Sequence, residues 1–160
     1  MSSRTRGLHR GAVALSAVAV SSCLSLGIPL GEAARPTGAL TVRGEAIDAV
    51  EPIELQPSAC VSGEHRLFLG ADFVDEAQGL IARLVIDPLG EPTLRVFPAA
   101  EPLQRGLVFA RSECARFELE LERTGWQINE IYALRVRLDV ECGEGESESV
   151  VGSVSAEGCR

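Results

Sequence analysis

The stretch FELELERTGWQINEIYALRVRLDVE, residues 117–141, contains two runs in which apolar and charged side chains alternate. The first run covers Phe117 to Arg123 and the second covers Leu134 to Glu141. A period of two residues is typical of a β-strand with one buried and one solvated face. Because Gly125 lies between the runs, we predict an antiparallel hairpin that turns around Gly125.

In the register that we predict for this hairpin, apolar side chains share one face and charged side chains share the other. The expected pairs are Leu121 with Val136, Leu119 with Leu138, Glu122 with Arg135 and Glu120 with Arg137. An exposed ion pair of this kind contributes about 0.2 to 1 kcal/mol. One face therefore belongs to the core, and the other is a solvated ladder of charges.

Short apolar or alternating runs, separated by Gly and Pro, continue after Ala39 and predict strands rather than helices. The expected strands are Leu40 to Asp48, Leu67 to Val74, Leu80 to Asp87, Thr93 to Phe97, Phe117 to Arg123, Glu130 to Glu141 and Ser149 to Ala156, while Leu103 to Ala110 fits either a strand or a helical turn. The run from Leu80 to Ile86 is apolar on both faces apart from Arg83, which is typical of a central strand. The predicted fold class is all-β, with residues 39–160 forming a single antiparallel β-sandwich or partly closed barrel.

The N-terminal residues have the pattern of a signal peptide. Arg4, Arg6 and Arg10 precede the small apolar run GAVALSAVAV, residues 11–20. An uncleaved anchor is the alternative, because residues 11–30 could just span a bilayer, but Ser, Gly and Pro interrupt the second half of that segment. We expect an exported protein whose signal segment precedes one domain.

The sequence Val20-Ser21-Ser22-Cys23 resembles the lipobox of bacterial lipoproteins, in which cleavage makes the lipid-bearing cysteine the new N-terminus. The resemblance implies a signal peptide over residues 1–22 and lipid attachment at Cys23. It also implies a protein held at the membrane of the cell envelope by its lipid. Residues 31–38 are small, contain Gly and Pro and lack periodicity, so we expect a tether over residues 23–38.

Ordinary signal cleavage after Ala33 or Ala34 is the alternative to the lipobox. The stretch LSLGIPL after Cys23 is apolar, whereas the segment after a lipidated cysteine is usually polar. Such cleavage would remove residues 1–34 and give a soluble periplasmic or secreted protein.

Cys23 either carries the lipid or is removed with the signal segment, which leaves four cysteines free to pair: Cys60, Cys114, Cys142 and Cys159. An even set in an exported protein predicts two disulfides, and the absence of close cysteine pairs argues against a metal site. The hairpin register places Cys114 and Cys142 at one end of the sheet. If Ser149 to Ala156 folds back, Cys159 lies roughly 30 Å from Cys142, at about 3.3 Å per residue. We therefore favour Cys114 with Cys142 and Cys60 with Cys159, with a strand end or a bulge absorbing a face mismatch at Cys114.

The charge of the chain excludes several classes of partner and reaction. The formal net charge is −8, and removal of the N-terminal arginines makes it more negative. Such a surface repels phosphate backbones and anionic headgroups, so we expect no nucleic-acid partner. The chain contains no lysine, which excludes Schiff-base chemistry and a P-loop lysine.

We find no constellation that predicts catalysis, a metal or a cofactor. His65 is the one histidine after the signal segment, and Ser62-Gly63-Glu64-His65 has the composition of an exposed loop. Asp72, Asp75 and Glu76 are candidate calcium ligands, but their spacing is that of an ordinary acidic turn. The run ending at Glu148 is likewise predicted to be a solvated turn, and we predict no enzyme activity.

Trp126 is the candidate anchor for a partner, together with Ile128 and Tyr132 close by in the sequence. A large aromatic ring just after Gly125 would lie at the predicted hairpin tip, where side chains are normally polar. The alternative is that the tip folds over the domain and buries the ring.

The C-terminal half resembles a group of small exported bacterial lipoproteins of unassigned function. The likeness extends from about Cys60 onward and is carried by Cys114, Phe117, the hairpin of residues 122–129, the run Leu138 to Cys142 and the segment Gly152 to Cys159. The chain ends Cys159-Arg160, where that group is expected to end Cys-His. The resemblance implies a cell-envelope location and no activity.

Two hypotheses for function follow. The first is a non-catalytic envelope protein, anchored by lipid, that binds or supports another exported protein. The second is a small β-barrel that carries an apolar ligand in an interior lined by Phe68, Phe73, Phe97 and Phe109. The sequence leaves the oligomeric state open.

Overall fold

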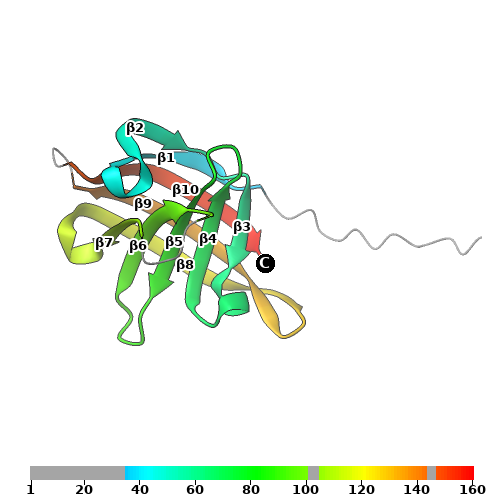
Figure 1. Ribbon diagram of the computed structural model, residues 1–160. Coiled ribbons are helices and arrows are strands. Elements are labelled where there is room, and N and C mark those ends of the chain that lie inside the picture. Colours follow the sequence, from blue (N-terminus) through cyan, green and yellow to red (C-terminus); the bar gives the residue numbers. More distant parts are fainter. Residues whose placement is uncertain (1–34, 101–104, 144–146) are drawn as a thin grey trace, which may run out of the picture. The chain divides into compact units, whose positions relative to one another are not determined.

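The computed structural model describes residues 35–100, 105–143 and 147–160, and these form two antiparallel β-sheets of five strands each (Figure 1). The sheets are not closed into a barrel, so of the two architectures expected from the sequence the sandwich is confirmed. In the described part of the chain, no helix is long and apolar enough to cross a membrane.

The first sheet has the strand order β2-β1-β10-β9-β8. Its strands are β1 (Thr37–Gly44), β2 (Ala49–Leu55), β8 (Cys114–Ile128), β9 (Ile131–Cys142) and β10 (Ser149–Cys159). The second sheet has the order β3-β4-β5-β6-β7. Its strands are β3 (Ala59–Ser62), β4 (Leu69–Asp75), β5 (Leu80–Ile86), β6 (Pro92–Pro98) and β7 (Leu107–Ala110).

Three short 3-10 helices connect the strands: η1 (Glu45–Ile47), η2 (Gly63–Arg66) and η3 (Arg111–Glu113). β5 is the central strand of its sheet, as its apolar run predicts. The ambiguous segment before Ala110 ends in a strand, β7.

The hairpin of β8 and β9 has the predicted register. Leu121 lies opposite Val136, Leu119 opposite Leu138, Glu122 opposite Arg135 and Glu120 opposite Arg137. The predicted turn at Gly125 is wrong, because β8 continues to Ile128 and the chain turns at Asn129 and Glu130, whose φ angles are 51° and 68°. Positive φ at both central residues is what a two-residue turn of type I′ requires.

The hydrophobic core lies between the two sheets and takes side chains from nearly every strand. Its fully buried members include Leu40, Leu55, Phe73, Leu84, Leu94, Leu107, Leu134, Val136 and Leu138. Burial of one such side chain contributes about 1.5 to 3 kcal/mol, so these positions supply much of the stability. The inward-facing residues of β9 are those that its alternating pattern predicts.

Several strand boundaries differ from the sequence-based expectation. β1 begins at Thr37, so the last two residues assigned to the tether belong to the sheet, and it ends at Gly44 rather than Asp48 because η1 follows. β2 and β3 were not predicted. β2 contains Pro52 and faces solvent at most positions, and β3 has only four residues, so neither has a clear alternating pattern.

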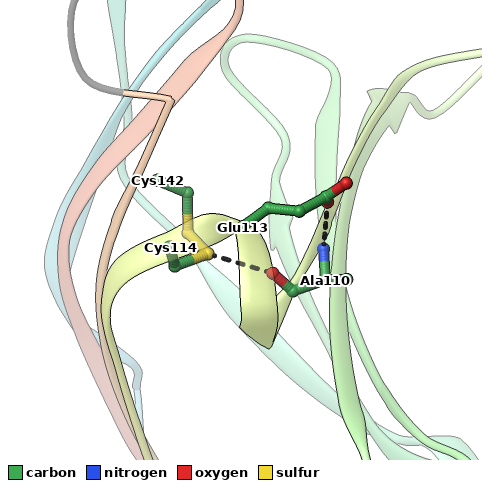
Figure 2. The surroundings of a disulfide bond; sticks show 4 residues. All are labelled: Ala110, Glu113, Cys114 and Cys142. Carbon is green, nitrogen blue, oxygen red and sulfur yellow. Dashed lines mark hydrogen bonds between the residues drawn. A yellow bond between two sulfur atoms is a disulfide. The ribbon is translucent and has the colours of Figure 1, made fainter.

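Two disulfides join Cys114 to Cys142 and Cys60 to Cys159, the pairs that the register argument favours. The register shifts between Cys114 and Arg116, so a bulge at Ala115 brings Cys114 opposite Cys142. Figure 2 shows this bridge beside η3, where the carboxylate of Glu113 accepts a hydrogen bond from the backbone N–H of Ala110 at 2.8 Å. The sulfur of Cys114 lies 3.3 Å from the carbonyl oxygen of Ala110, and since a disulfide sulfur carries no proton this is a packing contact.

Candidate functional site

An open groove lies between η2, the start of β4 and the end of the β8–β9 hairpin. Its volume is about 320 Å³, and its lining residues are Glu64, Leu67, Phe68, Leu69, Arg123, Glu130 and Tyr132. We call this surface the η2 groove. It brings together two segments that are far apart in the sequence and that belong to different sheets.

Glu64 connects the two walls of the η2 groove. Its Oε1 atom accepts hydrogen bonds from Nε and Nη2 of Arg123 at 3.0 and 2.6 Å, and its Oε2 atom accepts one from the backbone N–H of Tyr132 at 3.0 Å. The Arg123 guanidinium also lies over the Tyr132 ring, 4.9 Å from its centroid. The Glu64 side chain is only 16% exposed, so this fork of charge-assisted hydrogen bonds is partly shielded from water. Glu64 therefore fixes the hairpin against η2.

Leu67 stands at the rim of the groove in a conformation that a leucine rarely adopts. Its φ is 63°, in the left-handed region, and the residue is 97% exposed. For a residue with a Cβ atom this conformation costs about 1 to 2 kcal/mol. Because the Leu67 side chain is exposed, no free energy of burial offsets that cost. Strained residues of this kind are concentrated at binding and catalytic sites.

The backbone around Leu67 explains why the conformation persists. The N–H of Leu67 donates to the carbonyl oxygen of Glu64 at 3.3 Å, and the N–H of Phe68 donates to that of Gly63 at 3.1 Å. The Phe68 ring packs so closely on Gly63 that no Cβ atom would fit there. Ser62 closes the other end of η2, where its hydroxyl accepts a hydrogen bond from the N–H of Glu64 at 3.4 Å. The chain is thus held on both sides of Leu67.

A buried ion pair, Asp72 with Arg83, contacts the Phe68 ring that lines the groove. Arg83, which is 6% exposed, donates from Nε and Nη2 to the two carboxylate oxygens of Asp72 at 2.6 and 2.7 Å. Arg66 of η2 adds a bond to Asp72 at 2.6 Å. The Arg83 guanidinium also lies 4.9 Å from the centroid of the Phe68 ring and 5.3 Å from that of Phe97. These contacts hold one face of the Phe68 ring, which lines the groove.

The acidic residues considered as calcium ligands do not converge. Asp72 is buried in β4 with Arg83, whereas Asp75 accepts hydrogen bonds from the backbone N–H groups of Gln56, Ala77 and Gln78 at 2.7 to 3.0 Å. The turn predicted between Phe73 and Leu80 is present at residues 76–79, but Asp72 lies within β4, and both Asp72 and Asp75 are buried. Among the described residues, no group of His, Cys, Asp and Glu side chains is arranged to hold a metal ion.

The four phenylalanines proposed to line a ligand cavity lie in two different places. Phe73 and Phe109 belong to the core between the sheets. Phe68 and Phe97 lie on the other face of the second sheet, over Arg83. The expectation of one interior lined by all four is therefore wrong, because the rings of Phe68 and Phe97 lie outside the core.

Of the three residues predicted to bind a partner, Tyr132 lines the η2 groove. Trp126 and Ile128 belong to the end of β8, but their side chains lie outside the described residues, as do the acidic positions 144–146 and the anchor candidate Cys23. Glu64 and Leu67 were not predicted as site residues, and Phe68 was predicted to line an interior cavity instead. The available signal was the apolar run from Leu67 to Leu69 beside a predicted polar loop. His65 is exposed next to the groove, as its loop composition predicts. Comparison of the chain with family models, with curated proteins and with solved structures finds no match.

Proposed function

We propose that this chain is an exported, non-catalytic protein of the cell envelope that binds another exported protein through the η2 groove. The observation that carries the proposal is Leu67, an almost fully exposed leucine that the fold holds in a strained conformation at the rim of the groove. A partner that covers Leu67 would supply the burial that the free domain lacks.

The composition of the groove fits a protein partner. Leu67, Phe68, Leu69 and Tyr132 provide apolar and aromatic area, and Leu69 is 41% exposed. Arg123 and Glu130 provide a polar rim. Apolar area flanked by polar groups is the usual arrangement of a binding hot spot, and the hydrogen bonds of Glu64 hold the two walls of the groove in place before the partner arrives.

The envelope location is supported by two features of the chain. Its two disulfides are typical of proteins that fold in an oxidising compartment outside the cytosol. The N-terminal pattern and the resemblance to small bacterial lipoproteins support attachment to the membrane through a lipid on Cys23. We include that anchor in the proposal.

The test compares two glycine substitutions at exposed leucines. Leu67→Gly removes the side chain and relieves the strain, so the free energy of unfolding should stay unchanged or rise by up to about 1 kcal/mol. Crosslinking of the native protein to envelope partners should fall by at least about fivefold. Leu89→Gly is the matched control, because Leu89 is 88% exposed in the turn between β5 and β6 and does not line the groove.

Equal crosslinking by the Leu67→Gly variant and the unchanged protein would refute the proposal. An equal loss of crosslinking in Leu67→Gly and Leu89→Gly would also refute it, because the loss would then not be specific to the groove. A third variant, Glu64→Gln, keeps the shape of the side chain but removes its charge. It should weaken the hydrogen bonds to Arg123 and Tyr132 that join the two walls of the groove, and so weaken crosslinking.

A further inference from the structure

We propose that the outer edge of β8 accepts an extended, basic segment of a partner protein as an added strand of the first sheet. In the described residues β8 pairs with β9 alone, and it stands at the end of the sheet (Figure 1). This edge runs along residues 117–122, none of which lines the η2 groove, so the two proposals stand independently.

The other sheet edges are short or interrupted by a proline, whereas β8 has a long regular stretch between its two bulges. β3 and β7 have four residues each, and β3 is tied to the first sheet through Cys60. β2 contains Pro52, which cannot donate a hydrogen bond to an added strand. β8 has 15 residues without a proline, and its register with β9 is regular from Arg116 to Arg123. A long regular edge presents unpaired N–H and C=O groups that can pair with a strand of another chain.

The two faces of β8 specify what an added strand must contain. On the inner face Phe117 is buried, while Leu119 and Leu121 are only half-buried although they pack against the core. An incoming strand with apolar residues at every second position would cover these leucines. Inward-pointing charges, which often block an edge, are absent from residues 117–121 of β8.

The outer face of β8 carries Glu118, Glu120 and Glu122, all exposed. On the β9 side, Arg137 lies opposite Glu120, and Arg135 lies opposite Glu122 and bonds to it at 3.4 Å. The side away from β9 offers the same three carboxylates to a new neighbour. Arginine or lysine at alternate positions would then form cross-strand pairs like those already present in the hairpin.

The same charges argue against a second copy of this chain as the occupant. If two β8 strands paired antiparallel about Glu120, Glu118 would face Glu122 and the two Glu120 side chains would face each other. Like charges directly opposite each other destabilise a strand pair. The net charge of −8 adds repulsion between copies and attraction for a basic partner.

The probe is a peptide of about seven residues that alternates valine with arginine, titrated into the folded, oxidised protein and followed by fluorescence anisotropy. It should bind, and a peptide that alternates valine with glutamate should not. The combined variant Glu118→Arg, Glu120→Arg and Glu122→Arg should weaken binding of the arginine peptide at least about tenfold and should bind the glutamate peptide instead. If that variant unfolds, Glu120→Gln alone should weaken binding by about two- to fivefold.

Two methylated peptides separate strand addition from simple charge attraction. Each has the arginine–valine sequence, with methyl groups on one of the two alternate sets of backbone nitrogens. Because alternate N–H groups of a strand point to opposite edges, only one of the two peptides should lose binding. Equal binding of both would overturn the proposal, and so would a stable dimer of the unmodified protein in sedimentation experiments. Leu67→Gly should leave peptide binding unchanged, which keeps this test separate from that of the η2 groove.

Discussion

Asp72 and Arg83 show how a single pair of residues organises the candidate site. Both are buried, and the described residues contain no buried side-chain nitrogen or oxygen that lacks a hydrogen-bond partner. A buried ion pair gains little net stability, since removing two charges from water is costly. Its effect is to fix geometry: Arg83 fixes Phe68 and Phe97 from one side, and Asp72 fixes Arg66 of η2.

Substitution of Asp72 by alanine leaves Arg83 buried without its carboxylate. The free energy of unfolding, measured by urea denaturation of the oxidised protein, should fall by about 3 to 5 kcal/mol. The double variant Asp72→Val and Arg83→Leu removes both charges and should recover most of that loss. A double variant as unstable as Asp72→Ala would show that the pair supports the fold and not only the position of Phe68.

At the level of elements, the β8–β9 hairpin was predictable because its alternation is long and uninterrupted. The pattern determines which side chains face the core, and a slip of one residue would expose all of them. The turn was less predictable. Gly125 is the usual turn residue, but Asn129 and Glu130 take the positive φ angles instead, and a bulge between Arg123 and Gln127 accommodates the glycine within β8.

The two disulfides differ in what they constrain, and their removal should differ accordingly. Cys60 and Cys159 are 99 residues apart and join the two sheets, whereas Cys114 and Cys142 are 28 apart within one hairpin. The entropy of the unfolded chain predicts losses of about 4 to 5 kcal/mol for the first bridge and about 3 to 4 kcal/mol for the second. Paired Cys→Ala variants, compared by urea denaturation, test this order.

A larger loss on removing the Cys114 bridge would contradict the chain-entropy account of these disulfides. It would indicate that the bulge at Ala115 depends on the bridge for its native geometry. Reduction of the unmodified protein should lower the melting temperature more than either pair of substitutions alone.

For the whole molecule, the fold class was predictable from the sequence, but the candidate site was only partly so. Strand alternation, an even set of cysteines and turn residues together specify an all-β domain. The η2 groove requires η2 and the hairpin to meet across two sheets, and no local pattern encodes that contact. The left-handed conformation of Leu67 is equally hidden, since glycine and asparagine are the residues that usually mark such a position.

The charge distribution of the whole chain bears on how the domain reaches its partners. An acidic domain is repelled by anionic membranes, so any attachment to a membrane must be covalent or by insertion rather than by surface charge. The proposed anchor, Cys23, precedes the first strand by a short segment, because β1 begins at Thr37. A domain so attached would stay within a few nanometres of the membrane and would meet partners that are themselves in the envelope.

The attachment is tested by substituting the residue that would carry the lipid. The unmodified protein should be recovered from the membrane fraction, and mass spectrometry should show a mature chain that begins at Cys23 with its lipid. Cys23→Ala should lose the lipid and the mature N-terminus, whereas Ser22→Ala should keep both, because it preserves a small residue before the cleavage site. Melting of the domain should be the same in all three proteins, since both disulfides and every described strand lie after Cys23. A mature chain that begins at Ala34 or Arg35 without lipid would contradict the anchor and indicate ordinary signal cleavage, and the two binding surfaces would then belong to a soluble exported protein.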